Sequence, residues 1–485
     1  MIIKQFLDLI ERIGEFETDK MKLYLRDRCS LDEMVFITTD SRKIKKNSIF
    51  IAIKGKNVNG HDYINESFDK GAILSIIEDA GDYNGLCIKV DHVVQFINKM
   101  ASYLYKQYAG FTIAITGSNG KTTTKEWIKR LLSTFINQES IFANSENMNT
   151  EIGLPLCILN DLTTQKKYSV IEMGMSKKGD IEYLVDTYKP DFPVILNIGT
   201  AHIGNTGSLD NTFREKVKLM KHHSNDEPFC LNCSDSLLRQ YLKKCQKQKP
   251  ILFGQINDEI EDFSGVFLEN YRHYFQGQQF YTSFKLAIRC QGKNEQLENR
   301  LNGLFHKGQL LNVCAALAVV SSLGYAVDSL PDLSRVIGSI KDRFEPVFIR
   351  NHLFIKDCYN SSLESLRYAL ELLKKLKEDK KFKKIICVLG SIAETGPFEA
   401  EIHEKIGHFL NENRVDNVFL YTKDSGIKQI QKKYKGKVLS FSDVTALSME
   451  IKQRIQTKQN TVFLFKASRS IQLEEVFDHV MDVIN

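Results

Sequence analysis

A glycine-rich loop that leads into a lysine and three threonines constrains this chain more than any other feature. Residues 113–126 read IAITGSNGKTTTKE, so a short apolar run enters the loop. Gly117 and Gly120 let backbone N–H groups turn toward phosphate oxygens, and Lys121 brings a point charge to the outer phosphates. The Thr122 hydroxyl can bind a magnesium ion. The pattern predicts a nucleotide-phosphate loop between a strand and a helix.

The loop departs from the standard G-x-x-x-x-G-K-[ST] form in a specific way. It is one residue shorter between its glycines and its lysine, and Thr116 stands in place of the usual first glycine. This variant indicates one particular branch of phosphate-loop enzymes. We expect nucleotide contacts from Thr116, Gly117, Ser118, Asn119, Gly120, Lys121, Thr122 and Thr123.

Composition argues against several classes of protein. The 66 basic and 60 acidic residues give a net charge of +6, which is small for 485 residues and gives no support for nucleic-acid binding. The best apolar run, residues 313–320, is far shorter than the roughly 18 residues of a membrane span. Residues 1–12 form an acid-bearing amphipathic pattern rather than a secretory leader. We therefore expect a cytoplasmic protein. Cys230 and Cys233 form a lone C-x-x-C without the second pair that a zinc site needs, so we expect its cysteines to be reduced thiols.

Apolar patterns divide the chain into three units. Strand-like runs at 168–172 and 192–197 alternate with helical stretches in the middle unit, as in a parallel sheet with helices on both faces. Residues 265–290 look like a β excursion inserted late in that unit. The last unit repeats the alternation and is Rossmann-like. The predicted fold class is α/β, and the predicted domains are 1–108, 109–342 and 343–485.

Two candidate metal ligands follow successive strands of the middle unit. Glu172 ends one β run directly before Gly174, and His202 follows the next. Because the carboxyl ends of parallel strands meet at one edge of a sheet, we expect both side chains to face the phosphate loop. A carboxylate and a neutral imidazole suit a magnesium shell of mixed ligands. Spacing alone does not distinguish Lys216 from its exposed neighbours.

The series of motifs resembles the Mur ligases, ATP-dependent amide-forming enzymes of peptidoglycan synthesis. The resembling segments are 39–42, 48–50, 54–55, 60–62, 116–126, 147–149, 151–155, 172–174, 197–199, 201–202, 207–208, 357–360 and 466–469. They cover nearly the whole chain in order. Segments 124–126 and 357–360 are most similar to the branch called MurF, which joins D-alanyl-D-alanine to a UDP-N-acetylmuramoyl-tripeptide. The Asp-Asn-Pro-Arg motif of the MurE branch is missing.

The resemblance implies roles for further residues. Ser41 and Arg42 fall in the part that grips the UDP-sugar end of the substrate, and Asn149 and Asn360 also fall in substrate-binding segments. Lys216 falls where the family carries a carbamylated lysine that helps to hold the second of two magnesium ions. The implied ATP-binding residues outside the loop are Gln309, Asn312, Arg343 and Asp357.

The chain departs from the family at several positions. Gly308-Gln309 stands where the family has His-Asn, Ala467 replaces a glycine, and Lys218 replaces an acid. Residues 361–363 and 390–392 also differ, and most of these changes lie on the side that binds the incoming amine. Two alternatives therefore stay open, a Mur-type paralogue that joins a different carboxylate and amine, and a non-catalytic nucleotide-binding protein.

The charges involved suggest a mechanism. A carboxylate and a γ-phosphate repel each other, so Lys121 and magnesium must neutralise both before the carboxylate attacks ATP. The resulting acyl phosphate would then react with an amine, and closure of the C-terminal domain onto the central one would exclude water. The resemblance further implies a monomer.

Overall fold

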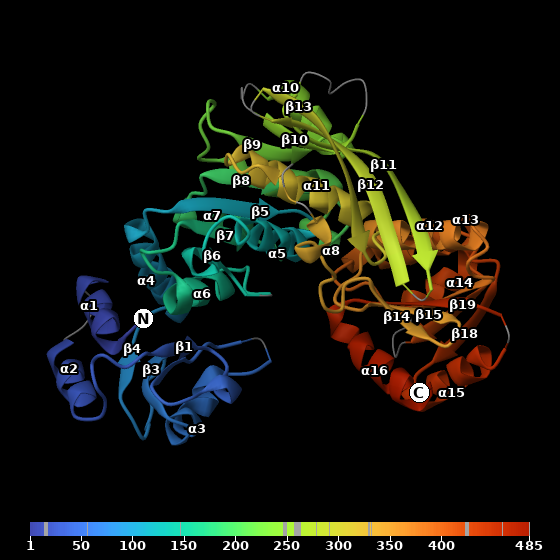
Figure 1. The fold of residues 1–485 in the computed structure, drawn as a ribbon. Helices are drawn as coiled ribbons and strands as arrows, with labels where there is room; N and C mark the ends of the chain where they lie inside the picture. Colours follow the sequence, from blue (N-terminus) through green and yellow to red (C-terminus); the bar gives the residue numbers. More distant parts are fainter. Residues whose placement is uncertain are drawn as a thin grey trace.

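The computed structural model describes most of the chain. The described residues are 1–13, 18–55, 57–145, 147–245, 250–256, 263–277, 279–290, 292–327, 330, 332–421, 426–457 and 459–484. Within these ranges the strands form three separate sheets. Figure 1 shows them as three masses, with the N-terminal unit in blue, the central unit from cyan to yellow and the C-terminal unit in orange and red.

The N-terminal unit is a small parallel sheet with helices around it. Its strands are β1 (Phe36–Thr38), β2 (Ser48–Ile51), β3 (Ala72–Ile77) and β4 (Cys87–Lys89), in that order across the sheet. Its helices are α1 (Ile3–Ile13), α2 (Thr18–Arg26), α3 (Ile64–Asp69) and α4 (Val93–Gln107). Helix α1 follows the predicted amphipathic pattern and buries its apolar side, including Phe6 and Ile10.

The apolar core does not stop at the predicted boundary after residue 108. Helix α4 packs against α6 (Gly153–Asp161) and α7 (Asp180–Tyr188), which belong to the middle of the chain. Met100 and Ile97 of α4 share one cluster with Ala114 and Ile171 of the central sheet. The N-terminal unit therefore has a continuous apolar junction with the central one, and the residue at which one domain ends and the next begins stays a prediction.

The central sheet carries the phosphate loop in its middle. Its strand order is β13-β12-β11-β10-β9-β8-β5-β7-β6, and the strands from β6 to β11 run parallel. The parallel strands are β5 (Phe111–Thr116), β6 (Ile141–Ala143), β7 (Tyr168–Glu172), β8 (Phe192–Ile195), β9 (Phe229–Asn232), β10 (Pro250–Gln255) and β11 (Gly265–Gln276). Ile113 and Ile115 of β5 pack with α5 (Lys121–Leu132) and α11 (Lys307–Ser322), whereas Ala114 packs on the opposite face. Burial on both faces explains the uninterrupted apolar run before the loop.

The β excursion predicted at 265–290 is confirmed and is longer than expected. Strand β11 pairs antiparallel with β12 (Gln279–Cys290), which pairs antiparallel with β13 (Lys293–Asn302). The β11–β12 hairpin reaches from the central sheet down to the C-terminal unit (Figure 1). There Phe280 stacks on Phe348 with ring centroids 5.3 Å apart and belongs to the apolar cluster of the C-terminal unit.

The C-terminal unit is a six-stranded sheet in the order β14-β15-β19-β16-β17-β18. The strands are β14 (Glu345–Ile349), β15 (His352–Asp357), β16 (Lys384–Leu389), β17 (Asn417–Tyr421), β18 (Lys437–Phe441) and β19 (Thr461–Lys466), and β14 alone runs antiparallel to its neighbour. Helices α12 (Leu363–Glu378) and α13 (Glu399–Glu412) cover one face, and α15 (Val444–Ile455) and α16 (Leu473–Ile484) cover the other. This arrangement confirms the predicted alternation and the α/β class. Among the helices that the structure describes, none has both the length and the apolar content needed to cross a membrane.

Candidate active site at the junction of the central and C-terminal units

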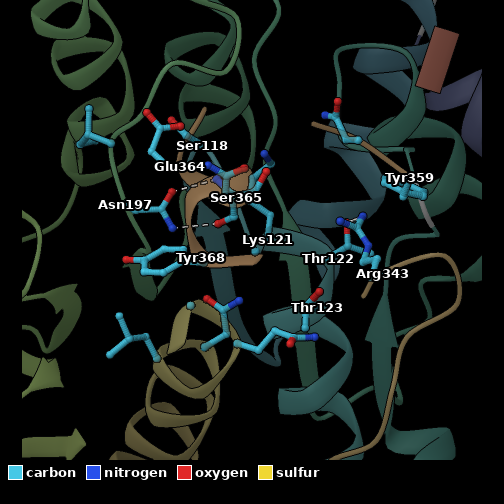
Figure 2. A pocket seen from close by; sticks show the side chains of 18 of the residues that line it. Ser118, Lys121, Thr122, Thr123, Asn197, Arg343, Tyr359, Glu364, Ser365 and Tyr368 are labelled. Carbon is cyan, nitrogen blue, oxygen red and sulfur yellow. Dashed lines mark hydrogen bonds between the residues drawn. The ribbon is translucent and has the colours of Figure 1, made fainter. Parts of the chain in front are cut away.

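A cavity of about 540 Å³ lies where the carboxyl ends of the central strands meet the C-terminal unit. Most of the predicted site residues line it, and these are Ser118, Asn119, Gly120, Lys121, Thr122, Thr123, Asn149, Glu172, His202, Gln309, Asn312, Arg343, Asp357 and Asn360. Figure 2 shows Lys121 between two walls, with Glu364 and Tyr368 on one side and Arg343 and Tyr359 on the other. The structure thus brings together residues that lie more than 200 positions apart in the sequence.

The phosphate loop is held in shape by the strand next to it. Asn119 N–H donates to Asn197 Oδ1 at 2.8 Å, and Asn197 Nδ2 donates to the Asn119 carbonyl at 2.9 Å. Gly120 has a φ of 82° and precedes the first residue of α5, where only glycine adopts the turn without strain. The α5 N-terminus and its free N–H groups therefore face the cavity as an anion site. Lys121 Nζ donates to the Gly117 carbonyl at 2.9 Å, and burial lowers the pKa of Lys121.

Thr122 and Glu172 place two oxygen atoms side by side. Thr122 Oγ1 donates to Glu172 Oε2 at 2.8 Å, while Asn149 Nδ2 donates to Glu172 Oε1 at 2.6 Å. Magnesium prefers one or two carboxylates together with substrate phosphates and water, so this pair fits the ion. The described residues contain no cluster of three or more His, Cys, Asp or Glu side chains that could hold a metal ion.

Arg343 reaches this pair from the start of the C-terminal unit. Its Nη2 donates to Thr122 Oγ1 at 3.0 Å, and its guanidinium lies 3.7 Å from the centroid of the Tyr359 ring. Its Nε is buried and has no hydrogen-bond acceptor among the described residues. A buried guanidinium N–H without an acceptor is costly. It therefore fits an anion such as a phosphate oxygen in the cavity.

His202 lines the cavity and is hydrogen-bonded to a residue that does not line it. Its backbone has a φ of 62°, and its Nδ1 forms a hydrogen bond with Glu394 Oε2 of the C-terminal unit. This bond lowers the pKa of Glu394. Because a carboxylate only accepts hydrogen bonds, Nδ1 carries the ring proton and Nε2 is the nitrogen that can bind a metal.

Lys216 lies behind the cavity lining rather than in it. It sits in α9 (Leu209–Val217), and only 1% of its surface is exposed. Burial lowers its pKa well below the ordinary lysine value, and the nearby Lys121 charge adds to that effect. A neutral amine is the form that reacts with carbon dioxide, so this environment fits the modification that the resemblance implies. Lys218, which replaces the family acid, pairs instead with Glu182 and Glu215.

The start of α11 shows what the Gly308-Gln309 departure does. Gln309 Oε1 accepts from the His306 backbone N–H at 3.1 Å, and His306 Nδ1 accepts from the Gln309 N–H at 3.2 Å. The Gln309 carbonyl therefore caps the helix. A side-chain carbon at Gly308 would lie 2.7 Å from Tyr368, whose ring stacks parallel to that of His306. Burial and the Lys466 charge lower the pKa of His306 to about 3, so its ring is neutral.

Asp357 is paired with Lys466, which lies in the resembling segment 466–469 but was not predicted as a site residue. Lys466 Nζ donates to Asp357 Oδ2 at 2.6 Å and to the Asn360 carbonyl at 3.1 Å. All three residues line the cavity. The pair joins the carboxyl ends of β15 and β19, which are neighbours in the sheet, so strand order places them together.

Sequence reasoning missed the residues by which the C-terminal unit holds the central one. Glu364 accepts from Thr200 N–H at 2.9 Å and from Thr200 Oγ1 at 3.1 Å, and Ser362 Oγ donates to Asn119 Oδ1 at 2.9 Å. Ser362 also caps α12, and a serine three residues before Ser365 was the one local signal available. Glu364 and Glu394 have no such local signal.

Ser41 and Arg42 lie away from this cavity. They belong to the short helix Ser41–Lys43 of the N-terminal unit, and Arg42 pairs with Asp40 on the surface. Thr116 and Gly117, at the start of the loop, are buried and do not line the cavity either. The assignments of these residues to a substrate or nucleotide stay predictions.

Comparison with known sequences gives one consistent result. Three profiles of one family match successive parts of the chain, "Mur ligase family, catalytic domain" at 33–106, "Mur ligase middle domain" at 115–320 and "Mur ligase, glutamate ligase domain" at 342–469. The UDP-N-acetylmuramoyl-tripeptide–D-alanyl-D-alanine ligase of Bacillus subtilis is 28% identical over 461 residues, covering 92% of this chain and 93% of its own. The Escherichia coli ligase of the same name is 25% identical over 441 residues, covering 91% and 92%.

Solved structures agree with the sequence comparison. The crystal structure of MurF ligase from Thermotoga maritima in complex with ADP has a TM-score of 0.77 at 29% identity, covering 93% of this chain and 98% of that one. MurF from Acinetobacter baumannii has a TM-score of 0.79 at 26% identity, covering 94% and 95%. With all three family domains matched in order and the fold shared over almost its full length, this chain belongs to the Mur ligase family.

Proposed function

We propose that this chain is an ATP-dependent, ADP-forming ligase that joins D-alanyl-D-alanine to a UDP-N-acetylmuramoyl-tripeptide, a step in the making of peptidoglycan precursors. Its relatives named for that reaction match it over 91–92% of its length. The observation that carries the proposal is the cationic, unsatisfied group in the cavity, the buried Arg343 Nε beside Thr122 and the phosphate loop. Such a group favours a polyphosphate whose charge must be neutralised.

The chain's own groups account for the first half of the reaction. Lys121 and Arg343 would neutralise the outer phosphates of ATP, so that the tripeptide carboxylate can attack the γ-phosphorus. That step forms the carboxylate O–P bond, breaks the bond to the β-phosphate oxygen and yields ADP and an acyl phosphate. Magnesium, held by Thr122, Glu172, His202 and Lys216, would supply further charge neutralisation when bound.

The second half of the reaction requires an amine and a site from which water is excluded. The free amine of D-alanyl-D-alanine would attack the acyl carbon, and inorganic phosphate leaves from the tetrahedral intermediate. The cavity lies between two units that touch through Ser362, Glu364 and Arg343. Docking of these units would keep water from the acyl phosphate while the amine enters.

The finer assignments belong to the same proposal. Lys216 would carry a carbamate, formed when its neutral amine bonds to carbon dioxide and loses a proton, and this group would hold a second magnesium ion. Ser41 and Arg42 would contact the UDP end, and Asn149 and Asn360 the peptide. The protein would act as a cytoplasmic monomer.

A substrate panel tests the proposal. Purified protein is mixed with ATP, magnesium, one UDP-N-acetylmuramoyl-peptide and one amine, and ADP release is followed. The proposal expects turnover only with the tripeptide and D-alanyl-D-alanine, and transfer of ¹⁸O from the labelled carboxylate into phosphate. Lys121→Ala serves as the inactive control.

Other outcomes point to the alternatives. Two of the departures lie side by side in the fold, since Ala467 packs against Gly390 and Ser468 N–H donates to the Ser391 carbonyl. Turnover with a different acid or amine would identify a paralogue with other substrates. No ADP release with any pair, in protein that binds ADP, would identify a non-catalytic nucleotide-binding protein.

A further inference from the structure

The turn that carries His202 is held by the C-terminal unit at successive positions. Thr200 is held by Glu364, and the buried Ile203 belongs to the apolar cluster of the C-terminal unit although it lies in the central one. Gly204 N–H donates to the Glu394 carbonyl at 2.9 Å. The same Glu394 binds the His202 ring through its side chain. One residue of the C-terminal unit therefore fixes both the backbone and the imidazole at this turn.

The backbones of the two units pack closely against each other at this turn. A side-chain carbon at Gly204 would lie 2.5 Å from the Gly396 nitrogen and 2.7 Å from the Glu394 carbonyl oxygen. Helix α8 (Ile203–Thr206) and the short helix Gly396–Phe398 thus touch through backbone, without side chains between them. Glu394 itself has a φ of 58°. A non-glycine residue in this conformation carries strain, which the contacts around it must offset.

We infer that Glu394 is a positioning residue for His202, so that the metal site of the central unit is completed only when the C-terminal unit docks. The inference rests on the proposed function, because it takes His202 as a magnesium ligand. The Glu394 carboxylate accepts the Nδ1 proton and leaves Nε2 with its lone pair. Ligating histidines commonly have such a carboxylate partner, which fixes the ring and its tautomer. Docking and metal binding are then coupled through one side chain.

Metal affinity is the direct test. Manganese replaces magnesium, and its binding to the ADP complex is followed by electron paramagnetic resonance, which needs no turnover. We expect Glu394→Ala to weaken manganese binding about 10- to 100-fold, the usual cost of removing such a partner. Glu394→Gln should recover much of the loss, because its carbonyl still accepts the Nδ1 proton. Glu401→Ala removes an exposed carboxylate of α13 that pairs with Lys405; it is the control and should leave the affinity unchanged.

Two further measurements separate positioning from a purely structural role. In a His202→Gln background, Glu394→Ala should have no further effect on manganese affinity, because its action passes through the imidazole. Small-angle X-ray scattering of the ADP complex should show the same compact particle for Glu394→Ala and the unaltered protein, since Glu364 and Phe280 still hold the units together.

The contrary outcomes are distinct. Equal manganese affinity for Glu394→Ala and the unaltered protein would overturn the positioning role and leave the ligase proposal intact. An affinity loss accompanied by an expanded particle, or one that persists in the His202→Gln background, would also overturn it. If the unaltered ADP complex bound no manganese at all, the metal site and this inference would fall together.

Discussion

Gly120→Ala is the substitution for which the structure best specifies the loss of stability. Gly120 has a φ of 82°, and a side-chain carbon there would lie 2.5 Å from Asn312 Nδ2. The left-handed backbone costs a non-glycine residue about 1–2 kcal/mol. Restoring an ordinary 3.4 Å contact would push the Asn312 amide away by roughly 0.9 Å, and such overpacking costs about 1–3 kcal/mol. Together, these two effects should lower the free energy of unfolding by about 2–5 kcal/mol.

Gly179 provides a matched control. It also precedes a helix with a positive φ, here 99°, but nothing lies within 4 Å of its would-be side-chain carbon. Gly179→Ala should therefore lower the free energy of unfolding only through the strain of the left-handed backbone, by about 1–2 kcal/mol. The difference between the two variants isolates the contact with Asn312.

The single tryptophan gives a suitable assay. Trp127 lies in α5, directly after the phosphate loop, and is fully buried, so its fluorescence reports unfolding of the central unit in urea. Asn312→Ala should remove the excess cost of Gly120→Ala and leave that of Gly179→Ala unchanged. Equal losses for Gly120→Ala and Gly179→Ala, or no rescue by Asn312→Ala, would refute the reasoning. ADP affinity measured by calorimetry should fall for Gly120→Ala and not for Gly179→Ala.

Three other predictions concern buried charges and docking. Burial lowers the pKa of Lys216, so between that pKa and 10.5 the unfolded chain holds a proton that the folded chain lacks. The free energy of unfolding should rise with pH across this window in CO₂-free buffer, and Lys216→Met should abolish that slope; an unchanged slope would contradict it. Lys466→Met leaves Asp357 buried without its partner and should cost about 3–5 kcal/mol in urea unfolding, of which Asp357→Asn in the same chain recovers a large part. Phe280→Ala should expand the particle in X-ray scattering because it removes the hairpin contact with the C-terminal unit, whereas the exposed Tyr274→Ala should not; equal profiles would count against the hairpin as a docking element.

Local sequence was enough to predict the strands that matter for the site. The runs at 168–172 and 192–197 contain β7 and β8, because a continuous apolar stretch bounded by polar residues is what a doubly covered strand requires. Strand β13 was missed, since Lys293–Asn302 is mostly polar and lacks a β-branched or aromatic pattern. It forms because β12 offers it an open edge, which is a property of the folded sheet.

The central half of the cavity was predicted from the sequence, and the C-terminal half was predicted in part. Arg343, Asp357 and Asn360 were named as site residues and line the cavity, whereas Glu364, Tyr368 and Lys466 also line it and were not named. Lys121, Thr122 and Glu172 could be placed because each follows a strand and belongs to a motif with fixed spacing. Gln309 was expected to bind ATP, which stays a prediction, and its side-chain carbonyl accepts from the His306 N–H at the start of α11. This contact depends on His306, three residues earlier, whose Nδ1 accepts from the Gln309 N–H in return.

The sequence by itself determined the phosphate loop, the alternation of strands and helices and the order of the motifs, because each depends on neighbours within a few residues. Only the tertiary structure decided which C-terminal side chains meet the loop. Glu364 and Glu394 are ordinary helix-start and turn residues until docking brings them to Thr200 and His202, 164 and 192 positions away. The physical reason is that the docking of the two units depends on contacts over their whole packed surfaces, so it cannot be predicted from any short stretch of sequence.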